Sequence, residues 1–329
     1  MLRLSGIVAV MVMFVLISDG SERAHAQAQA REVVFGELNP TAAEWPIYIA
    51  QSQGFFAAEG IKLTIVNGGS APNVINQVST GSVDIADDGT DSEIAAIGRG
   101  LPIVIIAPQF AVNPYSLLTV PSVKTWNELK GKSVMLGTKE DVTAISLAQL
   151  AAGHGLKMED FNILVGGSTP ARYAALLSGN VQGAMLLQPF DLLAQEKGMN
   201  VLGSAADVMK NWAFTCLVSN TSWLDKNGPL AVRFLRAVRR GIEYGYAHQD
   251  TAIKVLVESA HTDSEIARKS YELDFKKWRA WDPGFSLSAA ALQNVGKYQI
   301  EFGVIKTMPP IEKLYDGKYA AQAVSAPRG

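Results

Sequence analysis

The sequence has few of the residues on which catalytic and metal centres most often depend. Its 329 residues include one cysteine, Cys216, and four histidines. A single cysteine excludes an internal disulfide framework, and no C-x-x-C, H-E-x-x-H or phosphate-binding G-x-x-x-x-G-K-[ST] sequence is present. None of the histidines stands beside a serine or cysteine in a nucleophile motif. These absences argue against an enzyme, and no cofactor or metal is expected.

The sequence also lacks an excess of charge of either sign. It contains 29 Lys and Arg against 31 Asp and Glu, a net charge of −2. Because there is no basic bias, nucleic acid is not an expected partner. The 48% hydrophobic and 18% charged content is typical of a folded globular chain, and the length is sufficient for two domains.

Long apolar runs are absent except near the N-terminus. Residues 4–17 read LSGIVAVMVMFVLI and follow the basic Arg3. This run is short for a transmembrane helix but has the length of a signal-peptide core. The A-x-A sequence that ends at Ala26 is the expected cleavage site, with alternatives that end at Ala28 and Ala30. We therefore predict a signal peptide over residues 1–26 and a soluble periplasmic protein. The alternative is an uncleaved membrane anchor.

Apolar strands alternate with helical stretches along most of the remaining chain. Strands are expected over 32–38 and 61–66, around a helix over 46–60, and the alternation starts again near residue 133. Such alternation predicts an α/β fold with parallel-type sheets. We expect two lobes, each a doubly wound, mostly parallel sheet flanked by helices. The first lobe is discontinuous (31–119 and 219–329) and the second spans 120–218.

One motif occurs twice, 98 residues apart. Residues 65–83 read IVNGGSAPNVINQVSTGSV, and residues 163–181 read ILVGGSTPARYAALLSGNV. In each copy a strand leads into Gly-Gly-Ser, a proline follows two residues later, and Gly-x-Val precedes another apolar run. The glycines allow a ligand to approach the backbone closely, and the serine and proline suit the first turn of a helix.

This motif has two interpretations. Each copy alone is consistent with the capped strand-to-helix turn that any α/β protein needs. If the copies face one another from two lobes, their helix starts form a site for an anionic or strongly polar group. The identical spacing favours the second interpretation, a two-lobe protein that closes on a ligand.

The residues around the first copy of the motif carry a family resemblance. The stretch AQSQGFFAAEGIKLTIVNGGSAPNVINQVSTGSVDIADDGTD resembles the solute-binding proteins of ABC importers for nitrate, sulfonates and taurine, a fold family that includes binders of thiamine-pyrimidine precursors. The segments GPLAVRFLRAVRRGIEYGYAH and MPPIEKLYDGKYAAQA look like the same family. The resemblance implies a type II periplasmic-binding-protein clamshell, an ABC permease and its ATPase as partners, and no chemistry on the ligand. A monomer is expected.

The resemblance also implies which residues contact the ligand. They follow the strands that lead into the crevice, and by position they are Asn39, Thr41, Glu44, Trp45, Gly69, Ser70, Asp88, Gly89, Thr90, Thr138, Lys139, Ser168 and Gln188.

The ligand chemistry that these residues indicate is mixed. Trp45 would stack on a planar ligand or lie in the core, and Lys139 or Arg172 would pair with a sulfonate or carboxylate or remain solvated. The acids Glu44, Asp87, Asp88 and Asp91 argue against a bare inorganic anion. Asp87, Asp88 and Asp91 could accept from an amine or a heterocycle N–H, or Asp88 and Asp91 could flank Gly89 as turn and N-cap residues. We therefore expect a small organic anion or heterocycle, such as a sulfonate, taurine, an aromatic carboxylate or a pyrimidine.

Two other functions stay open. One is an enzyme of the same fold in thiamine-pyrimidine metabolism, although a chain with one cysteine lacks the cysteine-rich segment of the enzymes that resemble this family. The other is a ligand-sensing extracellular domain, for which a transmembrane anchor would be expected after the domain.

Overall fold

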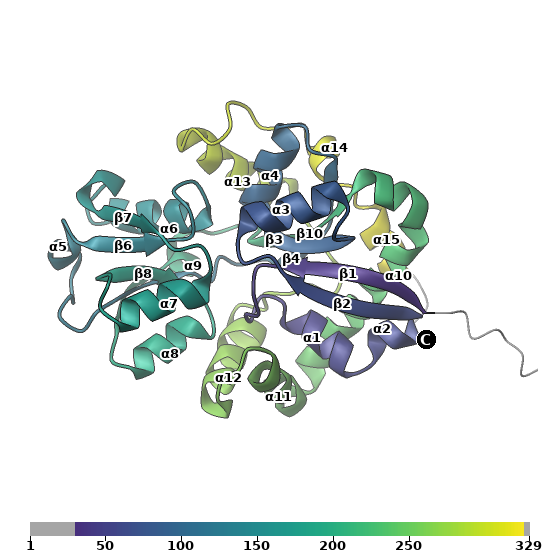
Figure 1. The fold of residues 1–329 in the computed structure, drawn as a ribbon, viewed down its shortest axis with the longest axis horizontal. Helices are drawn as coiled ribbons and strands as arrows, with labels where there is room; N and C mark the ends of the chain where they lie inside the picture. Colours follow the sequence, from purple (N-terminus) through teal and green to yellow (C-terminus); the bar gives the residue numbers. More distant parts are fainter. Residues whose placement is uncertain (1–29, 326–329) are drawn as a thin grey trace, which may run out of the picture.

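Two five-stranded sheets organise residues 30–325, the part of the chain that the computed structural model describes (Figure 1). The predicted signal peptide lies outside these residues. The first sheet has the order β2-β1-β3-β10-β4 and the second has the order β7-β6-β8-β5-β9. The strands are β1 (Arg31–Glu37), β2 (Ile61–Asn67), β3 (Ile85–Gly89), β4 (Ile103–Phe110), β5 (Ser116–Thr119), β6 (Ser133–Leu136), β7 (Asn162–Val165), β8 (Gly183–Leu186), β9 (Asn200–Ser204) and β10 (Thr215–Asn220).

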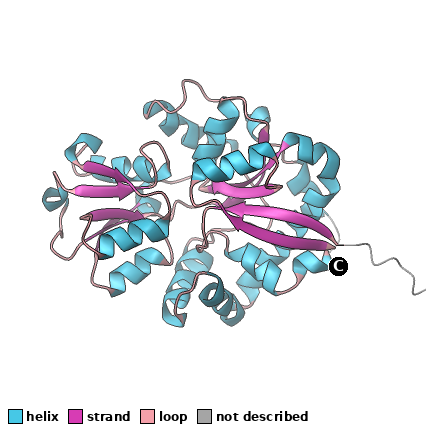
Figure 2. Ribbon diagram, in the orientation of Figure 1, coloured by secondary structure: helices cyan, strands magenta, loops and turns pink. Residues whose placement is uncertain are grey.

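Helices cover both faces of each sheet, which confirms the expected two-lobe α/β architecture (Figure 2). In the first lobe these are α1 (Trp45–Ser52), α2 (Phe55–Ala58), α3 (Ala71–Thr80), α4 (Thr90–Gly98), α10 (Thr221–Ala247), α11 (Gln249–Ser259), α12 (Ser264–Tyr271), the π-helical η2 (Glu272–Lys277), α13 (Ala289–Glu301), α14 (Ile311–Leu314) and α15 (Lys318–Ser325). In the second lobe they are α5 (Trp126–Leu129), α6 (Val142–Ala152), the short 3-10 helix η1 (Met158–Asp160), α7 (Thr169–Leu177), α8 (Phe190–Glu196) and α9 (Ala205–Val208).

Strand alternation explains why helices pack on both faces. In β1, Val33 and Phe35 point into the core that contains α1 and α10, and the Phe35 ring stacks on Phe234 of α10 at 5.8 Å between centroids. Val34, between them, packs instead against the cluster on the other face, which includes Val74 of α3. A strand with apolar residues on both sides needs cover on both faces.

Each described sheet contains one antiparallel strand, and both of these strands follow a crossing between the lobes. β5 pairs antiparallel with β8 and β9, and β10 pairs antiparallel with β3 and β4. The chain therefore enters the second lobe before Ser116 and returns to the first before Thr215. The expected boundaries at 119/120 and 218/219 placed β5 and most of β10 with the wrong sheet.

The helix expected over 46–60 is divided in two. Gly54 has a φ of +71°, a left-handed conformation that ends α1 and begins α2. Further along, α10 is kinked at Asn227, which has non-helical dihedral angles two residues before Pro229. Among residues 30–325 no helix combines the length and apolar character needed to cross a bilayer.

Candidate ligand-binding site

The site lies where the two lobes meet, around a cavity of about 60 Å³ that we call the inner cavity. Loops at the carboxyl ends of strands supply most of its wall, as expected for an α/β sheet. Its lining residues are Leu38, Asn39, Thr41, Ala43, Glu44, Ala71, Asp87, Asp88, Gly89, Asp91, Ser92, Tyr115, Asp141, Val142, Thr169, Leu187, Phe214 and Thr215.

The two copies of the repeated motif face one another at this cavity. Ser70 and Ser168 are the N-cap residues of α3 and α7, and each helix has a proline in its first turn. The first residues of the two helices, Ala71 and Thr169, both line the cavity. A Cβ atom added to Gly167 would lie 3.8 Å from the Gly69 carbonyl oxygen, so the two loops nearly touch. The predicted juxtaposition of the copies is confirmed.

The capping chemistry of the motif differs from the expectation. In the described structure, neither Ser70 nor Ser168 accepts a capping hydrogen bond through its side chain. The preceding glycines are required, because Gly69 and Gly167 have φ angles of +72° and +61°. The motif therefore positions the backbone of each loop, and the serine hydroxyls are left available.

Several polar contacts hold the lobes together in a closed arrangement. The Val142 amide donates to Asp91 Oδ2 at 2.9 Å, and the Ala42 amide donates to the Gln188 carbonyl at 3.2 Å. Farther from the cavity, Lys269 Nζ lies 2.8 Å from Glu196 Oε1. Each pair joins one residue of the first lobe to one of the second.

Carboxyl groups dominate the inner cavity. Glu44, Asp87, Asp88 and Asp91 come from the first lobe and Asp141 comes from the second. Burial raises the pKa of Glu44 and of Asp91 to about 7, and raises the pKa values of Asp87 and Asp88 well above their ordinary range. The charge of Asp141, which belongs to the second lobe, raises the pKa values of the first-lobe residues Asp91 and Asp88 further.

Some of these carboxyl oxygens have partners and others do not. Thr41 Oγ1 donates to Glu44 Oε2 at 2.8 Å, and Asp141 caps α6 by accepting from the Thr143 amide at 2.9 Å. Asp88 Oδ1 accepts from the Gly89 amide at 2.6 Å. Asp88 Oδ2 and both oxygens of Asp87 have no hydrogen-bond partner in the described part of the chain.

Arg172 does not contact the cavity, which corrects its expected pairing with an anionic ligand. The side chain is buried, and its Nε donates to the Met185 carbonyl at 2.8 Å. Nη1 donates to the Gly167 carbonyl, and Nη2 donates to Thr169 Oγ1 at 2.8 Å. Arg172 therefore stabilises the second copy of the motif from the side that faces away from the cavity.

Trp45 lies in the core of the first lobe. Its indole is fully buried, and Nε1 donates to the Ala252 carbonyl at 2.7 Å. Tyr271, Phe275 and Trp281 contact the ring edge-on, with centroids 5.2 to 6.4 Å away. The structure corrects the expectation that Trp45 contacts the ligand, because α12 and η2 supply the aromatic surface that covers it.

Two further expected contacts are also turned away from the inner cavity. The Thr90 hydroxyl donates to Cys216 Sγ at 3.2 Å inside the first lobe. The Gln188 side chain donates to Asp191 Oδ2 at 3.0 Å, so Gln188 joins the lobes through its backbone carbonyl. Both side chains are buried against the protein.

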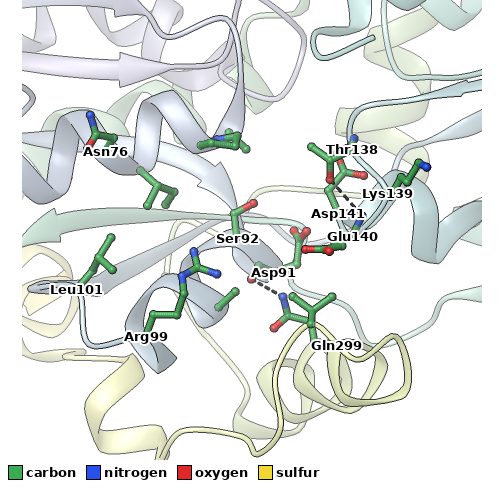
Figure 3. Close-up of a pocket in the computed structure, with 15 residues that line it drawn as sticks. Asn76, Asp91, Ser92, Arg99, Leu101, Thr138, Lys139, Glu140, Asp141 and Gln299 are labelled. Carbon is green, nitrogen blue, oxygen red and sulfur yellow. Dashed lines mark hydrogen bonds between the residues drawn. The ribbon is translucent and has the colours of Figure 1, made fainter. Parts of the chain in front are cut away.

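A larger outer cavity of about 470 Å³ adjoins the inner one, and Figure 3 shows the residues that line this outer cavity. The two cavities share Ala71, Asp91, Ser92 and Asp141 in their walls. Thr138 and Lys139 line the outer cavity from the second lobe, and Arg99 and Gln299 line it from the first. The expected contacts Thr138 and Lys139 therefore lie beside the outer cavity.

The inner cavity also includes residues that the sequence did not indicate as contacts. Thr169 lies within the second copy of the motif and could have been found there. Asp141 precedes an apolar helical run, the position of an N-cap residue. Tyr115 and Phe214 lie at the two crossings between the lobes, which no motif marks. Among residues 30–325 no group of three or more Asp, Glu, His or Cys side chains is arranged to hold a metal ion.

Comparison with known sequences gives one family and two kinds of relative. The family model described as "NMT1/THI5 like" matches residues 42–252. A putative binding protein, YtlA of Bacillus subtilis, is 22% identical over 326 residues, which are 96% of each chain. The 4-amino-5-hydroxymethyl-2-methylpyrimidine phosphate synthase THI5 of Saccharomyces cerevisiae is 22% identical over 250 residues, 71% of this chain and 72% of the yeast protein.

Comparison with solved structures confirms the fold. The periplasmic sulfonate-binding protein SsuA from Methylobacillus flagellatus, assigned to a putative sulfonate ABC transporter, superposes with a TM-score of 0.67 at 17% identity. The superposition covers 90% of this chain and 94% of SsuA. The two-lobe architecture of periplasmic binding proteins is thus the architecture of this chain.

Proposed function

This chain belongs to the NMT1/THI5-like family, and from that premise we propose that it is the solute-binding component of an ABC importer. It acts in the periplasm after removal of a signal peptide, captures a small organic ligand between its lobes and delivers it to a membrane permease with an associated ATPase. It performs no chemistry on the ligand.

The observation that carries this proposal is the meeting of the two motif copies at one interlobe cavity. The starts of α3 and α7 belong to different lobes, yet both line the inner cavity. A ligand that contacts both of them gains more contacts in the closed form than in an open one. Differential affinity of this kind is what a ligand needs to favour closure.

Among the expected contacts, several are retained as proposed ligand contacts. They lie on the inner cavity, on the outer cavity or on the facing loops, and they are Asn39, Thr41, Glu44, Gly69, Ser70, Asp88, Gly89, Thr138, Lys139 and Ser168.

The kinship with pyrimidine phosphate synthases gives a second candidate function, an enzyme. Within the described chain, the residues that line the inner cavity carry carboxyl, hydroxyl, amide and apolar groups, and Cys216 is buried behind Thr90. This set suits recognition of a polar solute better than covalent catalysis.

A thermal-shift screen tests the proposal and separates the two functions. The purified protein is heated with alkyl and aryl sulfonates, taurine, nitrate, aromatic carboxylates, pyrimidines and organic amines, since a ligand of the folded state raises the melting temperature. The hit is then incubated with the protein and recovered for mass spectrometry. An unchanged hit whose cellular uptake depends on this gene supports the proposal. Conversion of the hit to a product would establish an enzyme instead.

A further inference from the structure

We propose that the group which enters the inner cavity is an organic cation bearing N–H donors, such as an alkylammonium, amidinium or guanidinium group. This inference rests on the proposed function, because it names the class of solute that the same site takes. It departs from the sulfonate ligands of the structural neighbour.

The first argument is the set of carboxyl oxygens that lack a donor. Asp87 and Asp88 are 1% and 2% exposed, and both line the inner cavity. The Thr215 hydroxyl and the Glu44 carboxyl both act on the pKa of Asp87, so the oxygen that most clearly lacks a donor among the described residues is Asp88 Oδ2. A buried acceptor without a donor is destabilising, so a ligand that brings N–H groups satisfies a deficit built into the site.

The second argument is the sign of the charge around the cavity. Five carboxyl groups line it, and the described lining residues include no Lys, Arg or His. The guanidinium of Arg172 acts on the pKa of Asp141 from outside the cavity lining, and its nitrogens donate to the Met185 and Gly167 carbonyls and to Thr169. A sulfonate placed here would face unpartnered carboxyl oxygens, whereas a cation is attracted by them.

The third argument connects this charge to closure. Asp141 lies on the second lobe, Asp88 and Asp91 lie on the first, and the close-up shows Asp141 and Asp91 at the same junction (Figure 3). Burial together with the charge of Asp141 raises the pKa values of both first-lobe acids. Closing the lobes therefore places carboxyl groups of both lobes side by side, where their ionisation is unfavourable unless a cation lies between them. A cationic ligand would favour the closed form specifically.

The fourth argument concerns the size and kind of cation. A water molecule needs ~15 Å³ of cavity on the same scale, so about 60 Å³ admits a head group of about four heavy atoms. A quaternary ammonium has no N–H for Asp88 Oδ2, and no metal-binding arrangement exists among the described acids. Asn39 Nδ2, a buried donor without a described partner, would take an acceptor next to the cationic group. The remainder of the solute would extend into the outer cavity.

Isothermal titration calorimetry with matched probes tests the inference. The probes share a butyl chain and differ in the head group, namely butylammonium, butylguanidinium, butanesulfonate and butanol, with tetramethylammonium and zinc chloride as further cations. We expect binding of an N–H cation, and at least a tenfold loss of that affinity in Asp88→Asn. The control Asp225→Asn, which changes an exposed carboxyl outside both cavities, should bind like the unsubstituted protein. If Asp88→Asn does not fold, Asp87→Asn provides the same test.

The outcomes separate the inference from the proposed function. If the sulfonate or the neutral probe binds and neither N–H cation does, the inference is overturned while the binding-protein function survives. Saturable binding of zinc or tetramethylammonium in place of both N–H cations overturns it as well. If no compound in this set or in the thermal-shift screen binds to the folded protein, both the inference and the proposed function fail.

Discussion

Replacement of Glu44 by glutamine should make the unliganded protein less sensitive to alkaline pH. Glu44 is 5% exposed and accepts hydrogen bonds from the Thr41 hydroxyl and amide. The acids Glu37 and Asp87 lie nearby, and Tyr48 donates to Glu37 Oε2 at 2.7 Å. Burial raises the pKa of Glu44 from an ordinary 4.5 to about 7. The folded protein therefore keeps a proton that the unfolded chain loses as the pH rises through this window.

The sign and size of the effect follow from this difference. The stabilising contribution of protonated Glu44 is fully present below pH 4.5 and is lost as the pH rises through about 7. At ~1.4 kcal/mol per pH unit, ionisation of Glu44 removes about 3 kcal/mol from the free energy of unfolding. Glutamine keeps an oxygen for the Thr41 donors but does not ionise. Its neutrality also lowers the pKa of Glu37, now about 8, since Glu44 contributes to raising it.

Urea unfolding followed by circular dichroism at pH 5, 6, 7 and 8 measures this difference. Between the lowest and highest pH, the unfolding free energy of Glu44→Gln should fall by roughly 2 to 3 kcal/mol less than that of the unsubstituted protein. The control Glu312→Gln alters an exposed carboxyl and should follow the unsubstituted protein. Parallel curves for Glu44→Gln and the unsubstituted protein would refute the assigned role of Glu44.

Three other changes have clear expected results. Ser70→Ala should lower the free energy of unfolding in urea by less than about 0.5 kcal/mol, because the Ser70 side chain makes no capping hydrogen bond. A side chain that does cap a helix contributes about 1 kcal/mol, so a loss of that size would contradict the structure. Arg172→Met should lower the free energy of unfolding by about 3 kcal/mol or more in the same assay and weaken ligand binding, since the Met185 and Gly167 carbonyls lose their donor. Unchanged ligand binding would show that the loop of the second motif copy does not depend on Arg172. Lys269→Ala breaks the interlobe ion pair with Glu196, so small-angle scattering should report a more open unliganded protein with little change in stability. The control Lys276→Ala loses an ion pair within one helical segment and should leave the shape unaltered.

Local sequence signals accounted for most of the fold. Apolar periodicity located the strands and helices, and the repeated motif located the two loops that meet at the cavity. The lobe boundaries were misplaced because β5 and β10 are apolar strands whose partners lie far away in the sequence. Nothing within Ser116–Thr119 indicates that it pairs with β8 and β9. Sheet membership of a crossing strand is a nonlocal property.

The site was predictable only in part, for a similar reason. The first-lobe acids were recognised because they lie close to strand ends, where side chains gather around a crevice. The orientation of the Trp45 side chain depended on Phe275, which is far away in the sequence. The orientation of the Arg172 side chain depended on the Met185 carbonyl, which no local pattern around Arg172 indicates. Asp141 became part of the site only through closure of the second lobe onto the first.

The central position of β10 determines the order in which the lobes can be completed as the chain emerges from its N-terminus. β10 lies between β3 and β4, so the facing edges of both strands remain unpaired until the chain as far as Asn220 has emerged into the compartment where it folds. The second sheet uses only residues from Ser116 to Ser204 and is complete earlier. A growing chain normally folds its N-terminal domain first. Here the lobe that begins first is finished last, and the nascent chain must carry exposed strand edges while its second lobe forms.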